Sequence, residues 1–381
     1  LGLRSEASVI CSPIDAKYDS AGRHQDSCSI RFSTILDIPW CATHIKCGEC
    51  MLYMGLTCLG IESTAHTFGA AVVSGRKVLS NCKDAYSTES GGMVPSELAE
   101  HHVGCAASVI RDALRKADIT IHDIDLIAYS RSPGMGHALR IGAAAARSLA
   151  VLHRKPIIGV NHCIAHLEIG TLLTDATDPI LLYVSGANTQ VIAYEGGRYR
   201  IFGETLDNGI GNMFDSFARS IGLGFPGGPK IAELAKKGKQ YVELPYVVKG
   251  MDVSFGGILT NIRQKYASGR YAIEDLCYSL QETVFAMLVE VTERALAHCG
   301  KKEVLLGGGV ACNTRLQEMV SIMCKERGAI AYMLDAEYNL DNAAMIAWNG
   351  IQAYGSGQRL AVGKATIQPY VRTDEIEVTW R

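Results

Sequence analysis

The feature that most constrains the fold of this chain is a pattern of strands and small polar loops that occurs twice. In the first occurrence, an apolar run from Leu56 to Ile61 leads into the loop 62–67 and a second apolar run from Ala70 to Val73. About 120 residues later, the run from Ile180 to Val184 leads into the loop 185–189 and another apolar run. In both copies a glycine-containing turn then precedes a third strand. This repeat predicts a duplicated α/β fold.

Helix signals lie where such a layout needs them. Pro95 opens a segment with apolar residues at helical spacing, since proline is favoured at the first helical position. A helix is also predicted over 141–152, where many small residues indicate that another segment packs closely. A long amphipathic helix is predicted from Leu276 to Cys299, because Gly300 follows it and glycine commonly ends helices.

Composition excludes several classes of protein. Among 381 residues, 48% are hydrophobic and 20% are charged, so the chain can bury a core and is not disordered throughout. Lysine and arginine number 37 against 39 acidic residues, which excludes a general polycation that coats nucleic acid. The sequence lacks a run of about 18 apolar residues and a signal-peptide core at its first residues. We therefore expect a soluble cytoplasmic protein without membrane contact, built from two lobes of roughly 150–200 residues.

The cysteines divide into two groups. Eight of the 13 are scattered after residue 50, and examples such as Cys105 and Cys277 are interpreted as small buried hydrophobes. The first 50 residues also hold four residues of zinc-binding type: Cys41, His44, Cys47 and Cys50. A single Cys-x-x-Cys without a second pair is a weak zinc signal. We interpret residues 1–50 as an appended or poorly ordered tail.

Three loops that follow strands are rich in glycine, serine and threonine. They are 62–67, 185–189 and 307–313, and the third follows the strand 303–306. Such loops expose backbone N–H groups and hydroxyls that suit phosphate oxygens, although each alone fits an ordinary turn. Together they predict a nucleotide cleft between lobes. A Cβ added at Gly186 or Gly308 is expected to block nucleotide approach without unfolding the chain.

A histidine pair follows the apolar strand 157–160. His162 and His166 have the i, i+4 spacing that places two Cβ atoms about 5–6 Å apart on one helix face. This spacing fits one chelated metal, or two hydrogen-bonded histidines at a helix start. Cys163 stands where a zinc metalloprotease would have its glutamate, so that activity is not supported. Tyr183 and Asp341 are candidate oxygen ligands, and such a hard donor set suits iron or zinc.

Taken together, these segments resemble the family of the catalytic subunit of the KEOPS complex, the archaeal and eukaryotic relative of bacterial TsaD. The resemblance covers essentially Met54 to Arg381. It is carried by these motifs: Gly60-Ile61-Glu62-Ser63-Thr64-Ala65-His66-Thr67, Gly134-Met135-Gly136 with Leu139-Arg140, Asn161 to His166, Tyr183 to Thr189, Gly203 to Asp207, Phe225 to Pro229, Met251 to Phe255, Gly308 to Ala311 and Asp341-Asn342.

This resemblance implies an actin/hexokinase/Hsp70-like (ASKHA) α/β fold with a nucleotide between two lobes. The N-terminal lobe would comprise 54–174 plus 345–381, and the C-terminal lobe 175–344. The implied reaction transfers a threonylcarbamoyl group from threonylcarbamoyl-AMP to N6 of adenosine 37 in tRNAs that read ANN codons. Two alternatives on the same fold are a sugar or acetate kinase and an ATP-binding chaperone-like module. The histidine pair argues against the kinase.

The resemblance also implies site residues and cofactors. One divalent metal per subunit, Fe²⁺ or Zn²⁺, would be bound by His162, His166, Tyr183 and Asp341. An adenine nucleotide (threonylcarbamoyl-AMP, or an ATP analogue) would be bound by Tyr183, Val184, Ser185, Gly186, Ala187, Asp215, Gly228 and Asn313. The chemistry of the reaction, rather than the resemblance, makes His66 and Asp207 candidates to handle the proton of the amine, with a structural loop residue as the alternative for each. Ala232 stands where the family often has glutamate, which puts that contact in doubt.

The implied partners are tRNA, KEOPS subunits including a small kinase/ATPase, and the synthase that supplies threonylcarbamoyl-AMP. The segment Pro229 to Arg270 is a candidate tRNA surface. It holds eight positive and three negative residues, a net charge of +5 in a chain of net charge −2. Phosphate contacts from such a segment would position tRNA without reading its sequence. A solvated helix face with scattered lysines is the alternative.

Overall fold

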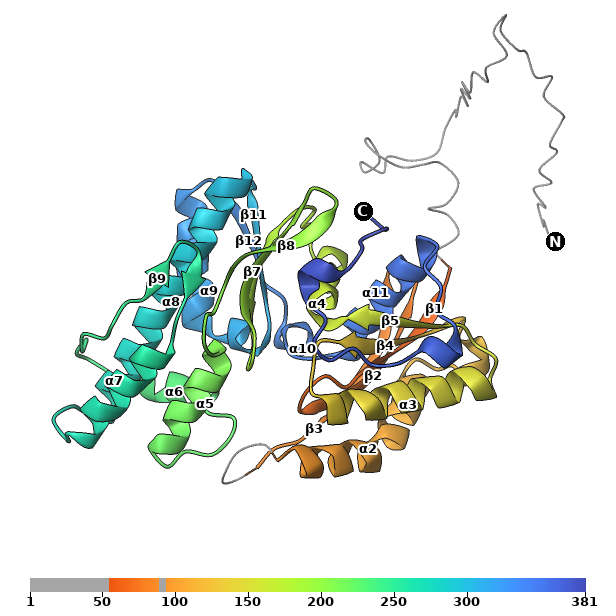
Figure 1. Ribbon diagram of the computed structural model, residues 1–381, viewed down its shortest axis with the longest axis horizontal. Helices are drawn as coiled ribbons and strands as arrows, with labels where there is room; N and C mark the ends of the chain where they lie inside the picture. The colour runs from red at the N-terminus through yellow and green to blue at the C-terminus, as the bar shows by residue number, and fades with distance from the viewer. Residues whose placement is uncertain (1–54, 89–93) are drawn as a thin grey trace, which may run out of the picture. The chain divides into compact units, whose positions relative to one another are not determined.

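The computed structural model describes residues 55–88 and 94–381, which form two mixed five-stranded sheets surrounded by helices (Figure 1). The predicted tail and its cysteine and histidine group lie outside the described residues. Within the described residues, none of the helices has the length and apolar character needed to span a membrane.

The two sheets have the same topology. The strands of the first sheet, in spatial order, are β3 (Lys77–Ala85), β2 (Thr67–Ser74), β1 (Thr57–Glu62), β4 (Leu126–Ser132) and β5 (Ile157–Asn161). The equivalent strands of the second sheet, in the same spatial order, are β8 (Arg198–Glu204), β7 (Thr189–Glu195), β6 (Ile180–Val184), β11 (Glu303–Gly307) and β12 (Ile330–Tyr332). Each central strand pairs antiparallel with the next strand of the chain and parallel with a later one. The predicted duplication is confirmed.

Helices complete the layers. Their bounds are α2 (Pro95–Lys116), α3 (Gly136–Leu152), α4 (His162–Leu173), α5 (Ile210–Ser220), α6 (Gly228–Ala235), α7 (Gly256–Ala267), α8 (Ile273–Cys299), α9 (Thr314–Glu326), α10 (Ala336–Asn339) and α11 (Ala343–Gly355). A small hairpin, β9 (Val248–Lys249) and β10 (Asp252–Val253), precedes α7. Two predicted helix ends are confirmed: α2 begins at Pro95, and α8 ends before Gly300, which has a φ of 64°.

Three groups of buried side chains hold these layers together. The first lies between the first sheet and the helices α2 and α3. The second joins the other face of that sheet to α4 and α11, and it continues to the second sheet. The third lies between the second sheet and the helices α5 and α8. Along β6, Leu181 and Tyr183 belong to the second group, whereas Leu182 belongs to the third, as the alternation of side chains along a strand requires. Helix α4 is therefore packed between the two sheets.

Two close approaches depend on glycine. A Cβ at Gly60 in β1 would collide with the carbonyl oxygen of Ala343, so α11 packs directly on that strand. A Cβ at Gly142 in α3 would collide with the hydroxyl of Ser63 in the loop after β1. The small residues of α3 predicted a close neighbour, and this loop is that neighbour.

Candidate active site

The histidine pair lies at the start of α4, where the chain leaves β5. Asn161 ends the strand and caps the helix, because its Oδ1 accepts hydrogen bonds from the N–H groups of Cys163 and Ile164 at 2.9 and 3.1 Å. The imidazoles of His162 and His166 are buried, with ring centroids 4.7 Å apart. The cap fixes the first turn of α4 and so aims both rings at the same point.

Tyr183 and Asp341 join the histidines from distant parts of the chain. The Tyr183 hydroxyl, near the end of β6, lies 3.1 Å from Nε2 of His162. Oδ1 of Asp341, between α10 and α11, lies 3.4 Å from Nε2 of His162 and 3.6 Å from Nε2 of His166. The structure thus brings together the four residues that the resemblance assigns to the metal, and we call this group the His162 site.

The donor atoms of the His162 site fit a divalent cation. One ligand atom each from His162, His166 and Asp341 lie within 4.8 Å of one another. Both ring nitrogens of His166 are buried without a hydrogen-bond partner, which is costly unless another group satisfies them. Two imidazoles, a carboxylate and a phenol form the donor set expected for iron or zinc.

Glu62, at the end of β1, is part of this environment, and the sequence did not indicate its role. Its Oε2 lies 3.0 Å from Nδ1 of His162, and its Oε1 accepts hydrogen bonds from the N–H and hydroxyl of Thr64 at 2.6 and 2.5 Å. A carboxylate behind a histidine fixes the tautomer and orientation of a ligand imidazole. The pairing joins positions 100 residues apart, so no local pattern reveals it.

Charges in the His162 site perturb its titration. Burial lowers the pKa of His162, but Glu62, Tyr183 and Asp341 together outweigh burial, so the pKa is raised well above its usual value. Burial raises the pKa of the Asp341 carboxyl, yet the two imidazoles beside it bring the pKa well below its usual range. Burial lowers the pKa of His166. The carboxylates of Glu62 and Asp341 face the two histidines, and their negative charge favours a nearby positive charge, which either a proton or a metal ion supplies.

The loop after β6 is anchored through its backbone to α5. The carbonyls of Ser185 and Gly186 accept hydrogen bonds from the N–H groups of Gly211 and Asn212 at 3.1 and 2.8 Å. Val184 is buried at the end of β6, whereas Gly186 and Ala187 are exposed. A Cβ at Gly186 would meet the Asn212 side chain at 3.4 Å, a contact that needs only a small adjustment.

Gly308 differs from Gly186. It has a φ of 93°, and a Cβ there would collide with the carbonyl of Val184 at the end of β6. Side chains are strained at such a φ, so a valine would disturb the backbone itself. The expectation that Gly308→Val leaves the fold unchanged is therefore wrong: this glycine is required by packing between strands.

Asp215 and Gly228 lie together at a helix start. Oδ1 of Asp215, on α5, accepts a hydrogen bond of 2.6 Å from the N–H of Gly227, directly before α6. Burial raises the pKa of the Asp215 carboxyl, although the N–H groups of Gly227 and Gly228 oppose that shift. A Cβ at Gly228 would meet open space.

The Ala232 side chain is half-buried, and Glu233 points to solvent and pairs with Lys236 at 2.6 Å. Glu233 therefore does not replace the family glutamate.

Asn313 has local hydrogen-bond partners. Its Oδ1 accepts from the N–H of Arg315 at 2.9 Å and so caps α9, while its Nδ2 donates to Gln281 Oε1 at 2.9 Å. These contacts fix the side chain at the start of α9. An approaching nucleotide would share or exchange them.

The two candidates for proton handling differ in their surroundings. The His66 ring is half-buried in the loop after β1 and packs edge-on against Phe225, with centroids 5.9 Å apart. The Asp207 carboxylate accepts hydrogen bonds from Phe255 N at 3.0 Å, Ser254 Oγ at 2.6 Å and Gly256 N at 2.7 Å. Burial raises the pKa of Asp207, but these donors bring it to about 2. So weak a base favours the structural alternative for Asp207.

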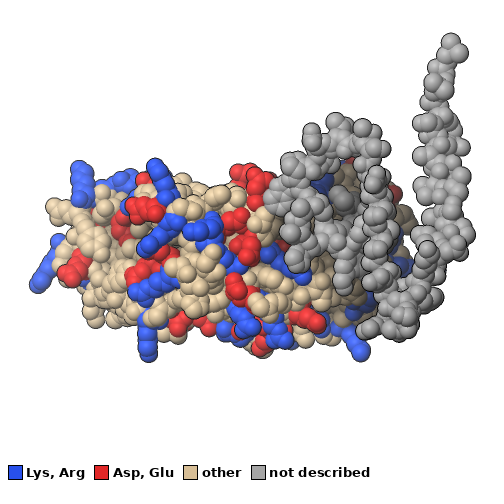
Figure 2. Space-filling model, turned by 90° about the horizontal axis from the view of Figure 1, so that it is seen from above, with Lys and Arg blue, Asp and Glu red and all other residues tan. Residues whose placement is uncertain are grey.

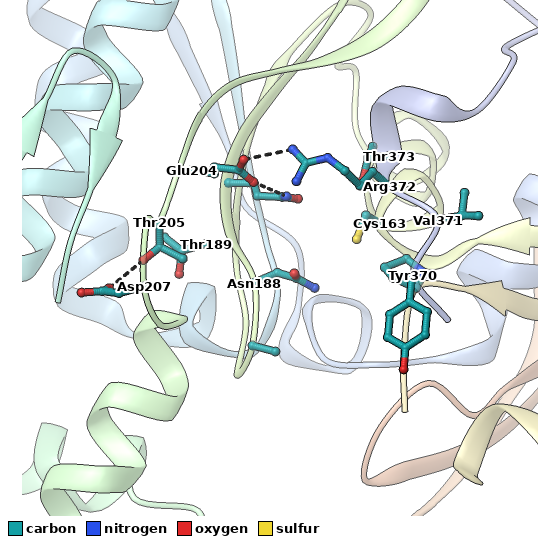
Figure 3. A pocket seen from close by; sticks show the side chains of 13 residues that line it. Cys163, Asn188, Thr189, Glu204, Thr205, Asp207, Tyr370, Val371, Arg372 and Thr373 are labelled. Atoms are coloured by element: carbon teal, nitrogen blue, oxygen red, sulfur yellow. Dashed lines mark hydrogen bonds and ion pairs between the residues drawn. The ribbon is translucent and has the colours of Figure 1, made fainter. Parts of the chain in front are cut away.

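A cavity of about 250 Å³ opens beside the start of α4 (Figure 3). Ala187 and the strand residues that follow it line one side, and the chain segment 370–373 lines the other. Arg372 crosses this space to Glu204 at the end of β8, with Nη2 and Oε1 3.0 Å apart. Cys163, directly after His162, also lines the cavity. The sequence did not indicate the segment 370–373, because its place depends on contacts across the fold.

Comparison with known proteins gives consistent results. A family model described as tRNA N6-adenosine threonylcarbamoyltransferase (TsaD) matches residues 77–348. A protein of that name from Thermococcus kodakarensis is 56% identical over 322 residues, 84% of this chain and 99% of the relative. One from Bos taurus is 51% identical over 330 residues, 85% of this chain and 98% of the relative. A "probable bifunctional tRNA threonylcarbamoyladenosine biosynthesis protein" from Thermoplasma acidophilum is 52% identical over 84% of this chain and 61% of that protein.

Solved structures with similar folds are more distant in sequence. Full-length HypF in its phosphate- and nucleotide-bound form matches with a TM-score of 0.54 at 11% identity, covering 78% of this chain and 55% of that one. HypF from T. kodakarensis matches with a TM-score of 0.56 at 16% identity, covering 78% of this chain and 47% of that one. These likenesses concern the fold alone, and the predicted ASKHA-type α/β fold is confirmed.

Proposed function

The chain belongs to the tRNA N6-adenosine threonylcarbamoyltransferase family, and from this premise we propose that it transfers a threonylcarbamoyl group to N6 of adenosine 37 in tRNAs that read ANN codons. Membership makes the chain a transferase of tRNA processing. The donor would be threonylcarbamoyl-AMP. The observation that carries the proposal is the convergence of His162, His166, Tyr183 and Asp341 at one end of β6, beside the loop that joins β6 to β7.

The reaction needs no nucleophile from the protein. The exocyclic amine of adenosine attacks the carbamoyl carbon of the donor, and the bond from that carbon to the phosphate oxygen breaks. AMP leaves with the electron pair, and the amine loses one proton. The protein therefore has to position two substrates, stabilise the charge that develops on oxygen, and exclude water.

We assign one divalent metal, Fe²⁺ or Zn²⁺, to the His162 site. Such an ion would supply Lewis-acid polarisation of donor oxygens. The residues of the chain prepare the site for it: Asn161 sets the direction of α4, and Glu62 holds Nδ1 of His162 so that Nε2 faces Tyr183 and Asp341. Burial keeps these groups away from bulk water, which strengthens each electrostatic contact.

The adenylate is proposed to bind along the exposed part of the loop 185–187 and the start of α6. Gly186 and Ala187 are exposed, and Gly228 has open space where a side chain would be, so a ligand can approach the backbone at these positions. Asp215 holds the start of α6 through Gly227. Backbone N–H groups at a helix start favour a negatively charged group. Asn313 would contribute only by changing its bonds to Gln281 or α9.

We further propose tRNA and KEOPS subunits, including a small kinase/ATPase, as partners. The segment Pro229 to Arg270 supports a tRNA surface next to Gly228. Seven of its basic residues are exposed: Lys230, Lys236, Lys237, Lys239, Lys249, Arg263 and Arg270. Over the described face in Figure 2, basic and acidic side chains are interspersed. Such a mixed surface would bind tRNA weakly alone, which is a reason for partner subunits to contribute.

The direct test is a reconstituted reaction. The full chain is incubated with tRNA, threonine, bicarbonate, ATP and a threonylcarbamoyl-AMP synthase, with and without KEOPS partner subunits. The tRNA is then digested and its nucleosides are analysed by mass spectrometry. We expect threonylcarbamoyladenosine only when the synthase and this chain are both present. Absence of the product with folded protein and all partners would reject the proposed activity.

A further inference from the structure

A second group of metal-binding side chains lies on helix α2, apart from the His162 site (Figure 1). His101, His102 and Cys105 face one another, and one ligand atom from each lie within 4.8 Å of one another. His102 and Cys105 are buried, and His101 is partly exposed. The interpretation of Cys105 as a buried residue is confirmed, and the two histidines beside it give its thiol the neighbours of a metal ligand. We call this group the His101 cluster.

The outer hydrogen bonds of the two histidines determine where their protons lie. Nε2 of His102 is 3.0 Å from the carbonyl oxygen of Ala65, which can only accept, so His102 carries its proton on Nε2. Nε2 of His101 is 3.0 Å from Oδ1 of Asp84, and a carboxylate likewise accepts. In the neutral rings, both Nδ1 atoms then present lone pairs. These two atoms lie 3.2 Å apart.

Two lone pairs facing at this distance repel unless a cation lies between them. The cation is either a proton or a metal ion. Burial lowers the pKa of His102 to about 4. Burial also raises the pKa of the Cys105 thiol to about 11, and the nearby Asp84 adds to that shift. A metal ion would release the thiol proton and neutralise the resulting thiolate.

The spacing matches tetrahedral coordination. Nitrogen ligands about 2.0–2.1 Å from a tetrahedral zinc lie about 3.3 Å apart, and a nitrogen and a sulfur ligand lie about 3.6 Å apart. The observed separations are 3.2 Å between the two Nδ1 atoms and 4.0 Å from Nδ1 of His101 to Sγ of Cys105. Small rotations of the side chains suffice to reach the ideal values. The outer partners, a carboxylate and a backbone carbonyl, are those typical of ligand histidines.

We propose that Nδ1 of His101, Nδ1 of His102 and the thiolate of Cys105 bind one zinc-class divalent cation, with water as the fourth ligand. Two imidazoles and a thiolate form a softer set than the His162 site, which has two oxygen donors, so the two sites differ in metal preference. Release of the thiol proton and loss of water from the ion balance the binding step. The ion would hold His102 in place and thereby fix the Ala65 carbonyl in the loop after β1.

The position of Ala65 links the cluster to the active site. The preceding residue, Thr64, lies 3.2 Å from Nδ1 of His162 through its hydroxyl, and the following residue is His66. A cation on α2 would therefore restrict the loop that carries groups of the His162 site. This is a structural role, and it does not depend on the proposed transferase activity.

Cobalt substitution tests the proposal on the full chain, because a thiolate bound to Co²⁺ gives an intense near-ultraviolet charge-transfer band. A site of imidazoles, carboxylate and phenol lacks this band. The metal-free protein is titrated with Co²⁺ alone, and bound metal is counted in parallel with Zn²⁺. Four variants are compared: Cys105→Ala, Cys277→Ala, His162→Ala with His166→Ala, and Cys47→Ser with Cys50→Ser.

We expect the band in the unchanged protein, its loss in Cys105→Ala, and its retention in the other three variants. Cys277 is a matched control because it is also a buried helix cysteine. The variant His101→Gln, at a partly exposed position, should also lose the band, which keeps the test valid if Cys105→Ala misfolds. Absence of the band, or its loss only in the Cys47/Cys50 variant, would overturn the proposal and assign a proton to the His101 cluster.

Discussion

The loops that follow β1 and β6 occupy the same place in the duplicated fold, but they use different chemistry. In the first, the carboxylate of Glu62 contacts His162, the first residue of α4, which follows the edge strand β5 of the same sheet. In the second, the Ser185 N–H donates to the Asn188 carbonyl at 2.8 Å, and loop carbonyls accept from the first turn of α5. One loop acts through a carboxylate, and the other through its backbone.

The comparison indicates how a duplicated fold acquires one asymmetric site. Strand order and pairing are kept in both sheets because they depend on backbone hydrogen bonds and alternating apolar residues. The loop side chains are free of that constraint and can differ. The first half thus provides the charge that organises His162, and the second half leaves an exposed backbone at Gly186 where a nucleotide can approach. Changes to the two loops should therefore have separable effects.

The largest effect is expected from His162→Ala combined with His166→Ala. Removal of both imidazoles should eliminate metal at the His162 site and lower transfer by roughly 10³-fold or more, because metal polarisation contributes several kcal/mol. Elemental analysis should show one metal fewer per chain. His122→Ala with His153→Ala is a matched control, since these rings also touch edge-on, at 5.6 Å, but lie outside the site. Unchanged metal content in the first variant would refute the ligand assignment.

The next effect should come from Glu62→Gln, which keeps the shape of the first loop but removes its charge. Loss of an outer carboxylate typically lowers metal affinity by about 10–100-fold. The pKa of His162 is raised by Glu62, so it should fall in this variant. Metal requires the neutral imidazole, and the proton competes with it at low pH.

This competition between the proton and the metal ion sets the direction of the pH effect. In the unchanged protein, metal occupancy should be lost as pH falls, and the loss should begin at a higher pH than for an ordinary histidine because the pKa of His162 is raised. In Glu62→Gln the proton binds less tightly, so the pH range of metal loss should shift downward although affinity at high pH is weaker. Glu97→Gln, at an exposed carboxylate that accepts from Tyr86, should change neither quantity. A midpoint that stays constant in Glu62→Gln would show that Glu62 does not govern His162.

Sequence patterns were sufficient where the physics is local. Apolar runs predicted eight of the ten strands of the two sheets, but not β4 or β12, and helical apolar spacing predicted the helices α2 and α8. Gly300 marked a helix end that the structure confirms. The i, i+4 spacing of His162 and His166 correctly indicated that the two rings share a face. Their proposed oxygen partners came from the family resemblance, and the structure brings Tyr183 and Asp341 to them in the His162 site.

The remaining features depend on contacts between distant segments. Glu62 and His162 are 100 positions apart, and Arg372 reaches Glu204 across 168. No period or motif encodes such pairings, because each joins segments that lie far apart in the sequence. His101 and His102 are adjacent in sequence, but their facing Nδ1 atoms became evident only from the outer hydrogen bonds to Asp84 and Ala65.

A smaller effect, confined to the second half, is expected from Gly228→Val. A side chain there meets open space in the protein, so folding should be nearly unaffected, while backbone approach by an adenylate would be blocked. Adenine-nucleotide affinity should fall by about 10-fold or more, equivalent to about 1.4 kcal/mol, as measured by calorimetry. Gly363→Val is a matched control, because that glycine also faces open space. Normal nucleotide affinity in folded Gly228→Val would place the nucleotide elsewhere. Unchanged metal content in Gly228→Val would show that nucleotide binding in the second half is independent of the His162 site.

The smallest effect should come from the basic segment, through Lys236→Ala, Lys237→Ala and Lys239→Ala combined. All three side chains are exposed, but Lys236 already pairs with Glu233 at 2.6 Å, so Lys237 and Lys239 should contribute most of the change. For every lysine that binds a phosphate, its removal should reduce the slope of log affinity against log salt by roughly 0.7–0.9. Binding of tRNA should weaken at low salt, and the variants should converge at high salt.

Exposed lysines outside the segment provide the comparison that decides where tRNA binds. Lys77, Lys116 and Lys325 are also exposed, so their combined change to alanine removes the same charge from the chain. If net charge alone governed binding, both triple variants would show equally weakened affinity, because long-range attraction depends on total charge. A reduced slope confined to the Lys236, Lys237 and Lys239 variant would instead show direct binding of phosphates. Equal slopes in the two variants would show that tRNA does not bind at α6, so the second half would bind the nucleotide but not tRNA.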